Sequence, residues 1–280
     1  MDVVPHPGGM TDVLRYTAFT TDPAGGNPAG VVLDATGLDD AAMLAIAAEV
    51  GYSETAFVLP RPEDDEFDVR YFSPRVEVPF CGHATVATAV ALGTTGTLRF
   101  HTPVGLVEVE AGNGTATLTS VPTSTEPATE ADLDRALTAL RWSRDDLDPR
   151  FPPHWAFAGG HHLVLAVKTR TRLKDLDYDF DALADLLREH DALTAQLVFQ
   201  REEDVFDARD PFPVGGVVED AATGAAALAF GGYLRDLGLI TGDRTITIHQ
   251  GVDMGRPSEL TVDVRQDDRR VRVTGAAVRI

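Results

Sequence analysis

The chain has 280 residues, of which 44% are apolar and 24% are charged, and its Gly and Pro counts of 25 and 17 are ordinary. These values are typical of folded globular proteins and exclude a wholly disordered or collagen-like chain. The net charge of −20 disfavours long-range attraction to nucleic acid or to anionic membranes. We therefore expect one or two folded domains without a nucleic-acid or membrane partner.

The cysteine content and the N-terminal segment bear on where the protein works. Cys81 is the sequence's single cysteine, which excludes an internal disulfide and a Cys-rich zinc site. Residues 1–11 lack the basic and apolar regions of a signal peptide and predict a flexible leader. Every apolar run is far shorter than the roughly 20 residues that cross a bilayer. These features favour a cytoplasmic protein.

The first half predicts strands, one amphipathic helix and one wholly apolar helix. Turn formers at residues 22–28 separate the first two strands, and Gly51 follows a run with helical apolar spacing. Residues 81–92 are small and apolar enough for a helix that is packed on all sides. The predicted strands are 13–19, 30–33, 55–59 and 67–72, the first helix is 38–50, and three β-rich pieces follow the second helix up to about residue 120.

The second half repeats this pattern. Residues 122–131, rich in Thr, Pro and Glu, are the best candidate linker. Residues 217–228 lead into a second small-residue helix, as the first half leads into its own. We therefore expect two similar lobes with approximate two-fold symmetry and a binding cleft between them. The other predicted elements are an amphipathic helix at 179–190 and strands at 195–199, 245–249, 259–264 and 270–274.

Several known catalytic motifs are absent from the sequence. It has no phosphate-binding Gly-x-x-x-x-Gly-Lys loop, no Gly-x-Gly-x-x-Gly after a strand, no Gly-x-Ser-x-Gly elbow and no His-Glu-x-x-His pair. Lys168 and Lys174 lie in a polar, basic segment that does not suit a Schiff base. His161 and His162 would point to opposite faces of a strand and could not share one metal. We therefore expect neither a bound nucleotide, nor a pyridoxal cofactor, nor a metal.

The starts of the two small-residue helices are candidate anion sites. Backbone N–H groups at residues 82–85 and 222–225 would lack intrahelical partners, and the small side chains would let a carboxylate approach the backbone. The alternative is that these small residues only allow two core helices to pack closely. Helix dipoles act locally, so an anionic substrate remains compatible with an acidic protein.

Four side chains near these helices are candidates for chemistry. Glu54 lies at the mouth of a predicted buried strand, where partial burial would let a carboxyl group take and return a proton. His83 is a candidate acid or donor, Cys81 a candidate nucleophile and Asp220 a second candidate carboxylate. The alternatives are an exposed turn residue for Glu54, a structural imidazole for His83, simple packing for Cys81 and a helix cap for Asp220.

Five ordered blocks of sequence resemble the PhzF-like phenazine-biosynthesis isomerase family, whose fold is that of diaminopimelate epimerase. Together they cover most of the chain, and five ordered blocks are a far more specific signal than any one of them. The blocks are Gly26-Asn27-Pro28, residues 48–57 with Ser53-Glu54-Thr55, residues 70–85 with Cys81-Gly82-His83-Ala84-Thr85, residues 219–224 with Glu219-Asp220 and Thr223-Gly224, and residues 250–258 with Gln250-Gly251.

The resemblance implies an α+β fold of two similar lobes, each a curved, mostly antiparallel β-sheet wrapped around a central helix. We expect the lobes at residues 1–125 and 126–280, with the last strand able to return to the first lobe. The resemblance also implies a homodimer that needs no cofactor and acts on a small-molecule carboxylate. By position it makes Glu54 the acid/base and places His83 and Asp220 in the pocket. The expected substrate-binding residues are Ser53, Cys81, Gly82, Ala84, Thr85, Thr223, Gly224 and Ala225.

The family's best-known reaction moves a proton within a dihydro-hydroxyanthranilate, and two departures put that substrate in doubt here. The second helix motif commonly has a proline and a serine where this chain has Ala221 and Ala225, so a rigid turn and a hydroxyl are lost. Two alternatives stay open. One is a Cys81/Asp220 epimerase, and the other is a binding protein that keeps the cleft without catalysis.

Overall fold

The computed structural model describes residues 4–6 and 9–280, and the chain divides into two compact units. Unit 1 comprises Met1–Leu118 and Thr274–Ile280, and unit 2 comprises Thr119–Val273. The chain therefore passes into unit 2 at residue 119, a few residues before the expected boundary at 125/126, and it returns to unit 1 at Thr274, within the last strand. Within the described part of the chain, every helix is too short or too polar to span a membrane.

The predicted flexible leader, residues 1–11, falls partly outside the described residues, which omit 1–3 and 7–8. Its remaining residues contribute two short strands. β1 (Val4–His6) and β2 (Gly9–Thr11) pair antiparallel with each other.

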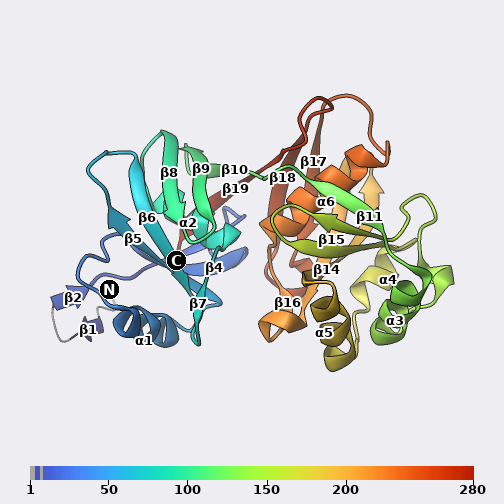
Figure 1. The fold of residues 1–280 in the computed structure, drawn as a ribbon, viewed down its shortest axis with the longest axis horizontal. Coiled ribbons are helices and arrows are strands. Elements are labelled where there is room, and N and C mark those ends of the chain that lie inside the picture. Colours follow the sequence, from blue (N-terminus) through green and yellow to red (C-terminus); the bar gives the residue numbers. More distant parts are fainter. Residues whose placement is uncertain (1–3, 7–8) are drawn as a thin grey trace. The chain divides into compact units, whose positions relative to one another are not determined.

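Unit 1 is a closed sheet wrapped around the helix α2 (Gly82–Leu92), as Figure 1 shows. Neighbouring strands pair antiparallel, except that β4 with β5 and β6 with β8 pair parallel. Pairing of β10 with β19 closes the sheet, and the short β7 (Glu77–Val78) pairs with β6. In hydrogen-bonded order the strands are β19 (Val271–Arg279), β3 (Leu14–Ala18), β4 (Asn27–Val32), β5 (Glu54–Pro60), β6 (Glu66–Phe72), β8 (Gly96–Thr102), β9 (Gly105–Gly112) and β10 (Thr115–Thr119).

The helix α2 is buried on all sides, as its composition predicts. Ala84, Val86, Ala87 and Ala89 are completely inaccessible to solvent. Their short side chains let several strands approach one helix closely, which a helix of large residues would prevent. The predicted central helix of the first lobe is therefore confirmed.

The helix α1 (Asp40–Val50) covers the outside of the unit 1 sheet. It begins where the Asp39 carboxylate accepts a hydrogen bond from the Ala42 N–H at 2.8 Å, and it ends at Gly51, whose φ of 73° is left-handed. Its apolar face packs against β4, β5 and β6. The cluster consists of Met43, Ile46 and Ala47 with Val32, Ala35, Phe57 and Phe72.

Unit 2 is built in the same way around the helix α6 (Gly224–Asp236). Its strands pair antiparallel, except that β13 with β14 and β15 with β17 pair parallel. β16 (Val217–Asp220) pairs with β15 at the edge. The strand order is β11 (Ser124–Pro127), β12 (His154–Phe157), β13 (His161–Ala166), β14 (Ala192–Glu202), β15 (Val205–Phe212), β17 (Arg244–Gln250), β18 (Ser258–Val264) and the start of β19.

The order of strand pairings is repeated between the two units. The parallel pairs β4–β5 and β6–β8 of unit 1 correspond to β13–β14 and β15–β17 of unit 2. The central helix follows the short edge strand in both, α2 after β7 and α6 after β16. The predicted repeat and the predicted α+β fold are thus confirmed, and Cys81 and Thr223 occupy the same position, the residue before the central helix.

The prediction that residues 122–131 form a linker is wrong. Ser124–Pro127 form β11, which pairs with β12, and Thr129 begins the helix α3 (Glu130–Leu140). The Thr129 hydroxyl oxygen accepts a hydrogen bond from the Asp132 N–H at 3.1 Å. Thr and acidic residues are favoured at the first turn of a helix, so a composition typical of a loop here marks a helix start.

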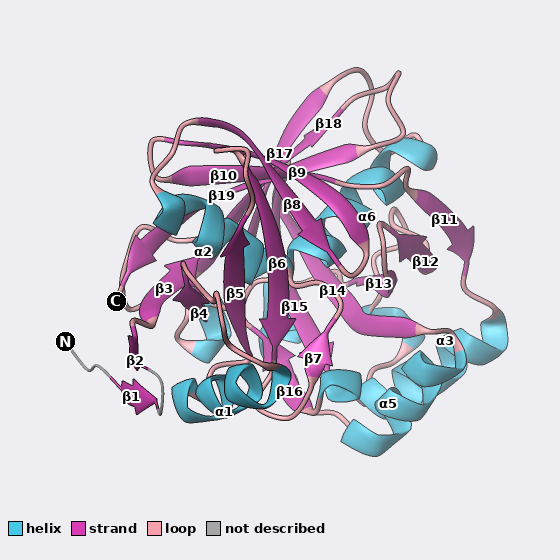
Figure 2. Ribbon diagram, turned by 60° about the vertical axis from the view of Figure 1, so that its left-hand side comes forward, coloured by secondary structure: helices cyan, strands magenta, loops and turns pink. Residues whose placement is uncertain are grey.

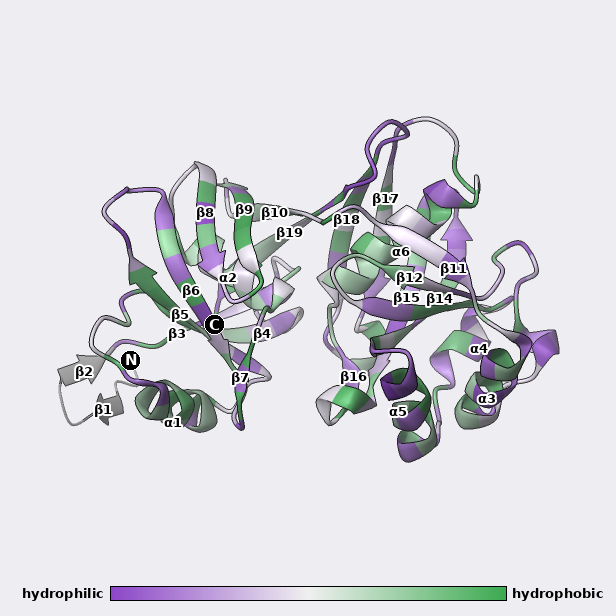
Figure 3. Cartoon of the chain, viewed as in Figure 1, coloured by the Kyte–Doolittle hydropathy of each residue, from purple (hydrophilic) through white to green (hydrophobic). Residues whose placement is uncertain are grey.

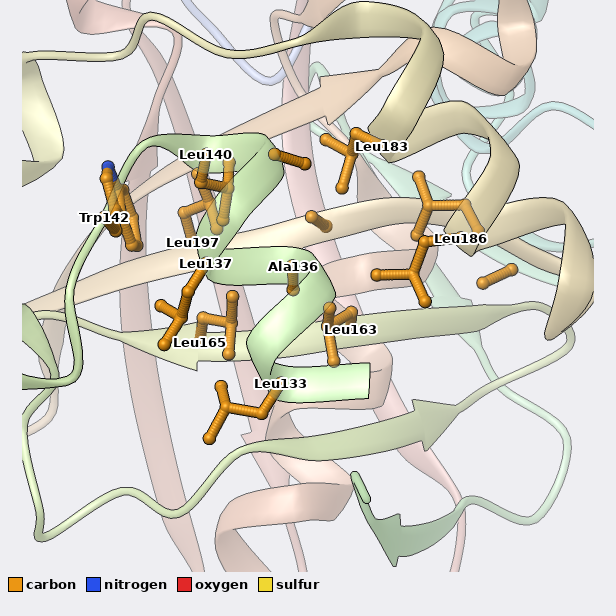
Figure 4. Close-up of a cluster of buried hydrophobic side chains, with 14 of the residues drawn as sticks. Leu133, Ala136, Leu137, Leu140, Trp142, Leu163, Leu165, Leu183, Leu186 and Leu197 are labelled. Carbon is orange, nitrogen blue, oxygen red and sulfur yellow. The ribbon is translucent and has the colours of Figure 1, made fainter. Parts of the chain in front are cut away.

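A hydrophobic cluster in unit 2 holds α3 and α5 (Phe180–Glu189) against the sheet. The two helices lie side by side (Figure 2) and carry hydrophilic residues on their outer faces (Figure 3). Figure 4 shows the leucines of both helices gathered over β13 and β14. The short helix α4 (Arg170–Lys174) adds Leu173 to the same cluster. Its labelled members are Leu133, Ala136, Leu137, Leu140, Trp142, Leu163, Leu165, Leu183, Leu186 and Leu197.

Candidate active site

Glu54 is the first residue of β5, and its side chain is largely buried. It is paired with Ala29 on the parallel strand β4, and only 16% of the side chain is accessible. The apolar residues that follow Glu54 form the buried part of β5. Because Glu54 is the first residue of this buried strand, its carboxyl group is also largely buried. The exposed-turn alternative for Glu54 is therefore wrong.

The first turn of α2 brings Cys81 and His83 to Glu54. The Cys81 thiol donates to Glu54 Oε2 at 3.5 Å, and His83 Nε2 lies 3.4 Å from the same oxygen. Ser53 Oγ lies 3.3 Å from His83 Nε2. The predicted residues Ser53, Glu54, Cys81 and His83 thus form one cluster, which we call the Glu54 cluster.

Asn27 orients the imidazole ring of His83. Its side-chain Nδ2 lies 3.2 Å from His83 Nδ1. An amide nitrogen can only donate, so Nδ1 accepts and the ring proton is on Nε2, which faces Glu54 and Ser53. Asn27 is 4% exposed and begins β4. The sequence marked Asn27 only as part of the Gly26-Asn27-Pro28 motif, without a role.

We expect Asn27→Asp to place a proton on Nδ1 of His83. An aspartate oxygen can only accept a hydrogen bond, so Nδ1 donates in the variant, whereas it accepts in the wild-type protein. The ¹⁵N chemical shifts of His83 measure the tautomer directly. Asn27→Ala, which offers neither donor nor acceptor, is the matched control; an unchanged tautomer in Asn27→Asp contradicts the assignment.

The other predicted residues of α2 divide into two groups. The Thr85 hydroxyl donates to the Cys81 carbonyl at 2.7 Å and lies 2.7 Å from the Tyr71 hydroxyl, and Thr85 is fully buried. Thr85 therefore stabilises the start of α2 through its hydroxyl group, and its contact with substrate stays a prediction. Gly82 and Ala84 stay candidates for backbone contacts, because the first N–H groups of a helix have no intrahelical partner.

The start of α6 in unit 2 is held by a second hydrogen-bonded group. The Thr223 hydroxyl donates to Asp220 Oδ2 at 2.7 Å. Gln250, fully buried at the end of β17, donates to the Asp220 carbonyl and to Thr223 Oγ1, both at 2.9 Å, and accepts from the Thr223 N–H at 3.1 Å. We call these residues the Asp220 group. The sequence marked Gln250 as part of a motif. It did not predict that Gln250 would form hydrogen bonds with Asp220 and Thr223 in the loop before α6.

The predicted residues Gly224 and Ala225 begin α6, next to this group. They occupy the positions that Gly82 and His83 occupy in α2, so unit 2 has a methyl group where unit 1 has an imidazole. Gly251 keeps the loop before α6 close to β17, because a Cβ there would lie 2.7 Å from the Ala221 carbonyl oxygen. Only glycine allows this approach of two backbones.

A buried polar chain lies behind Asp220. Asp210, its partner in the β15–β16 pairing, is fully buried and accepts a hydrogen bond from the Thr194 hydroxyl at 2.8 Å. The Gln196 amide, with its nitrogen toward Asp210, reaches both carboxyl oxygens at 2.7 and 2.9 Å. His162 Nδ1 lies 2.8 Å from Thr194 Oγ1. No local sequence pattern predicts this set of buried hydrogen bonds, because each of its residues looks like an ordinary strand residue.

Burial shifts the pKa values of two residues in this set of hydrogen bonds, Asp210 and His162. Desolvation raises the pKa of Asp210 well above its ordinary value, and it lowers the pKa of His162 to about 3. His162 is thus neutral. Its neighbour His161 lies on the other face of β13 and is partly exposed, with Nδ1 3.2 Å from the His190 carbonyl oxygen. The two adjacent histidines therefore do not share a ligand.

Comparison with known proteins decides the family. The model of the family described as phenazine biosynthesis-like protein (PhzC-PhzF) matches residues 16–280. The chain belongs to this family. An uncharacterized isomerase of Salmonella typhimurium is 36% identical over 290 residues, covering 95% of each chain. The trans-2,3-dihydro-3-hydroxyanthranilate isomerase of Pseudomonas fluorescens is 33% identical over 281 residues, covering 96% of this chain and 97% of the relative.

Solved structures agree with this assignment. A PhzF-family protein of Bacillus anthracis has a TM-score of 0.86 at 26% identity, covering 96% of both chains. A hydroxyproline epimerase of Agrobacterium vitis shares the fold alone, with a TM-score of 0.64 at 11% identity over 96% of this chain and 88% of the epimerase. The PhzF-family chain is therefore an isomerase with the expected epimerase-like fold.

The repeat bears on the two-thiol form of an epimerase, which is distinct from the Cys81/Asp220 alternative. Racemisation by two thiols needs a second cysteine, and the position equivalent to Cys81 holds Thr223. The Thr223 hydroxyl already donates to Asp220. An alcohol is far less acidic than a thiol, so Thr223 does not replace a thiol as a proton donor and acceptor.

Proposed function

We propose that this PhzF-family isomerase moves a proton within a small cyclic or unsaturated amino or carboxylic acid, with Glu54 as the acid/base. The observation that carries the proposal is the largely buried Glu54 carboxyl group, which faces His83 Nε2 at 3.4 Å and the Cys81 thiol at 3.5 Å. A carboxyl group so placed has donors to hold it and no cationic Lys or Arg among the contacts described above. It is suited to take a proton and return it.

The reaction follows from this arrangement in two steps. Glu54 as carboxylate removes a carbon-bound proton, and the resulting anion is conjugated over the unsaturated acid. Donors at the start of α2 stabilise the negative charge: the N–H groups of its first turn, which have no intrahelical partner, and His83. Glu54 then returns the same proton to another carbon. One carboxyl group serves both steps, and the sequence of steps needs no cofactor.

The Asp220 group is proposed to bind the substrate. Asp220 and Thr223 present a carboxylate and a hydroxyl at the start of α6, where the resemblance predicted substrate contacts. Gln250 fixes both, so this end of α6 is preorganised. Ala225 offers no hydroxyl here, so contacts at that position come from the backbone and we expect a substrate that does not rely on a serine.

The proposal is tested by proton exchange in deuterated water. The protein is incubated with a panel that begins with trans-2,3-dihydro-3-hydroxyanthranilate, the compound named in the Pseudomonas relative, and extends to other unsaturated cyclic amino acids. Deuterium incorporation is read by mass spectrometry. We expect exchange with at least one member. Binding of panel members, seen as thermal stabilisation, without any exchange would instead favour the binding-protein alternative.

Two further predictions accompany the proposal. The family resemblance predicts a homodimer, which sedimentation at micromolar concentration tests. A cytoplasmic location stays a prediction from the single cysteine and the acidic composition.

A further inference from the structure

Two arginines bind the edge strands that lead into the central helices, one in each unit. In unit 1, Arg70 on β6 donates from Nε and Nη2 to the two carboxyl oxygens of Glu77 on β7, both at 2.7 Å. In unit 2, Arg209 on β15 donates from the same two nitrogens to the carboxyl oxygens of Glu219 on β16, from Nε at 2.9 Å. Each pair is a bidentate, charge-assisted contact, which is stronger and more directional than an ordinary hydrogen bond.

The strand registers show that the two Arg–Glu pairs are equivalent in the repeat. In both units the arginine lies opposite an apolar residue of the preceding strand, and the residue two positions later lies opposite the glutamate. The glutamate in turn comes four positions before the residue at which the central helix begins, Cys81 or Thr223. The paired residues are Arg70 with Phe57 and Phe72 with Glu77 in unit 1, and Arg209 with Leu197 and Pro211 with Glu219 in unit 2.

The third nitrogen of each arginine contacts a helix that packs against the sheet. Arg70 Nη1 donates to Asp40 Oδ1 at 2.7 Å, and Asp40 is the first residue of α1. Arg209 Nη1 donates to the carbonyl oxygen of Lys174 at 2.7 Å, and Lys174 is the last residue of α4. The last carbonyl groups of a helix have no intrahelical partner, so this contact also satisfies the end of α4. Each arginine therefore joins an inner strand, an edge strand and a helix.

The starts of α2 and α6 lack the usual capping side chain. Neither Cys81 nor Thr223, the residue before each helix, accepts a side-chain cap hydrogen bond from the first turn. Such a bond normally fixes the point where a helix begins. In addition, β7 has only two residues, so backbone pairing alone holds it weakly. An Arg–Glu pair four residues upstream fixes the approach to each helix from outside and leaves the first turn open to a ligand.

Burial and geometry make each pair rigid. The side chains of Arg209 and Glu219 are 11% and 5% exposed, and those of Arg70 and Glu77 are 28% and 33% exposed. Water and salt screen partly buried charges less than surface charges. A planar guanidinium group matches a carboxylate with two hydrogen bonds at once, whereas an ammonium group does not. The shape of arginine, and not only its charge, therefore fixes the edge strand.

We propose that Arg70 and Arg209 are positioning residues, each of which fixes the start of one central helix through its glutamate. Arg70 thereby orients the Glu54 cluster, and Arg209 orients the Asp220 group. The consequence for the reaction rests on the proposed function, which places the acid/base in unit 1 and substrate contacts in unit 2. Local order and reaction kinetics are therefore measured separately.

The role of Arg70 is tested with Arg70→Lys, which keeps the positive charge but loses the bidentate contact. Cys81 is the single cysteine of the sequence and is 8% exposed, so its rate of alkylation by iodoacetamide reports how often the start of α2 opens. We expect this rate to rise by at least about tenfold, because a hydrogen bond between charged groups is lost. Glu77→Gln, which changes the other partner, should give the same result.

The role of Arg209 is tested by hydrogen–deuterium exchange of residues 217–223, which comprise β16 and the loop before α6. In Arg209→Lys we expect this segment to exchange faster by at least about tenfold, while Cys81 is alkylated at the wild-type rate. Glu219→Gln should do the same. Arg70→Lys should in turn leave the exchange of residues 217–223 unchanged. Each substitution thus loosens only its own helix start, which a general loss of stability would not do.

The matched controls are Arg61→Lys and Arg135→Lys. Arg61 donates to Asp68 at 2.8 Å in unit 1, and Arg135 forms a bidentate pair with Glu189 in unit 2. Neither pair involves β7 or β16, so we expect wild-type rates in both controls. Wild-type rates in either test variant, or equal loosening of both helix starts by a single substitution, would overturn the inference.

The consequence for the reaction is measured by substrate proton exchange. A shift of about 1 Å in a reacting group costs up to about 10²-fold, so Arg70→Lys should lower kcat by about 10- to 10²-fold with little change in KM. Arg209→Lys should raise KM by about tenfold with little change in kcat. If both helix starts loosen but the kinetics stay at wild-type values, the positioning of the helices stands and the proposed sites of reaction and binding are wrong. If Glu54→Gln abolishes exchange but neither helix start loosens, the acid/base role stands and this inference is wrong.

Discussion

Glu54→Gln is expected to reduce substrate proton exchange by about 10²–10⁴-fold while the protein stays folded. Glutamine has the size and shape of glutamate, and its side-chain oxygen can still accept from the Cys81 thiol and from His83 Nε2. What it lacks is the ability to take a proton from carbon at neutral pH. The range is the usual contribution of a positioned acid or base to a reaction rate.

The exchange rate of the variant is compared with that of a substitution of the same kind outside the cluster. Glu49→Gln is suitable, because Glu49 is exposed on α1 only five positions away. We expect Glu49→Gln to exchange at the wild-type rate. Glu54→Asp, which keeps the carboxyl group but withdraws it by one methylene, should retain part of the activity. Wild-type exchange in Glu54→Gln would exclude Glu54 as the acid/base.

Local sequence patterns were sufficient to predict the helices α1, α2 and α5. The helix α2 follows from a run of small apolar residues, and α1 and α5 follow from helical spacing and from acidic N-caps at Asp39 and Asp179. These features depend on residues within one or two turns. The helix α3 was missed because its cap, Thr129, lies in a stretch whose composition is equally typical of a loop.

The sequence predicted the candidate site residues that lie in a recognised motif. It did not predict the roles of partners that are distant from them along the chain. Glu54 and His83 were identified by position, and they lie 3.4 Å apart. Asn27, which orients His83, is 56 positions away from it in the chain, and Gln250 is 27 positions from Thr223. Long-range pairs of this kind depend on strand register, which one sequence without relatives does not specify.

The repeat explains why the two helix starts differ although their surroundings match. Cys81-Gly82-His83 and Thr223-Gly224-Ala225 occupy equivalent positions before and within α2 and α6. In unit 1 the position after glycine carries an imidazole that faces a carboxyl group. In unit 2 it carries a methyl group, and the polar contacts belong to the loop instead. In the proposed reaction, the acid/base group therefore belongs to one half of an internally repeated fold.

His162 is expected to make the protein lose stability as the pH falls. Its Nδ1 contacts Thr194 Oγ1, and Nε2 is buried without a hydrogen-bond partner among the described residues. Burial lowers its pKa from 6.5 to about 3 in the folded protein, so between these values the unfolded chain binds a proton that the folded chain does not. The stabilisation is complete above pH 6.5 and is lost as the pH falls toward 3.

The expected slope is about 1.4 kcal/mol per pH unit for one proton, so the contribution of His162 to the unfolding free energy should fall by about 2–3 kcal/mol between pH 6.5 and pH 4.5. Asp210 acts in the opposite sense. Its pKa is raised, so the folded chain binds the extra proton above pH 3.8, and stability from Asp210 falls as the pH rises. The net slope of the wild-type protein therefore understates the contribution of His162.

A comparison of variants isolates that contribution. His162→Asn keeps a donor near Thr194 but cannot take a proton, so its unfolding free energy should depend less on pH, by about 1.4 kcal/mol per unit below pH 6. The test compares how the unfolding free energy changes with pH and not its absolute value, because the smaller side chain also destabilises the core at every pH. Denaturant unfolding at several pH values measures it, with His161→Asn on the opposite face of β13 as the control. Parallel pH profiles for His162→Asn and the wild-type protein would mean that His162 is not held neutral by burial.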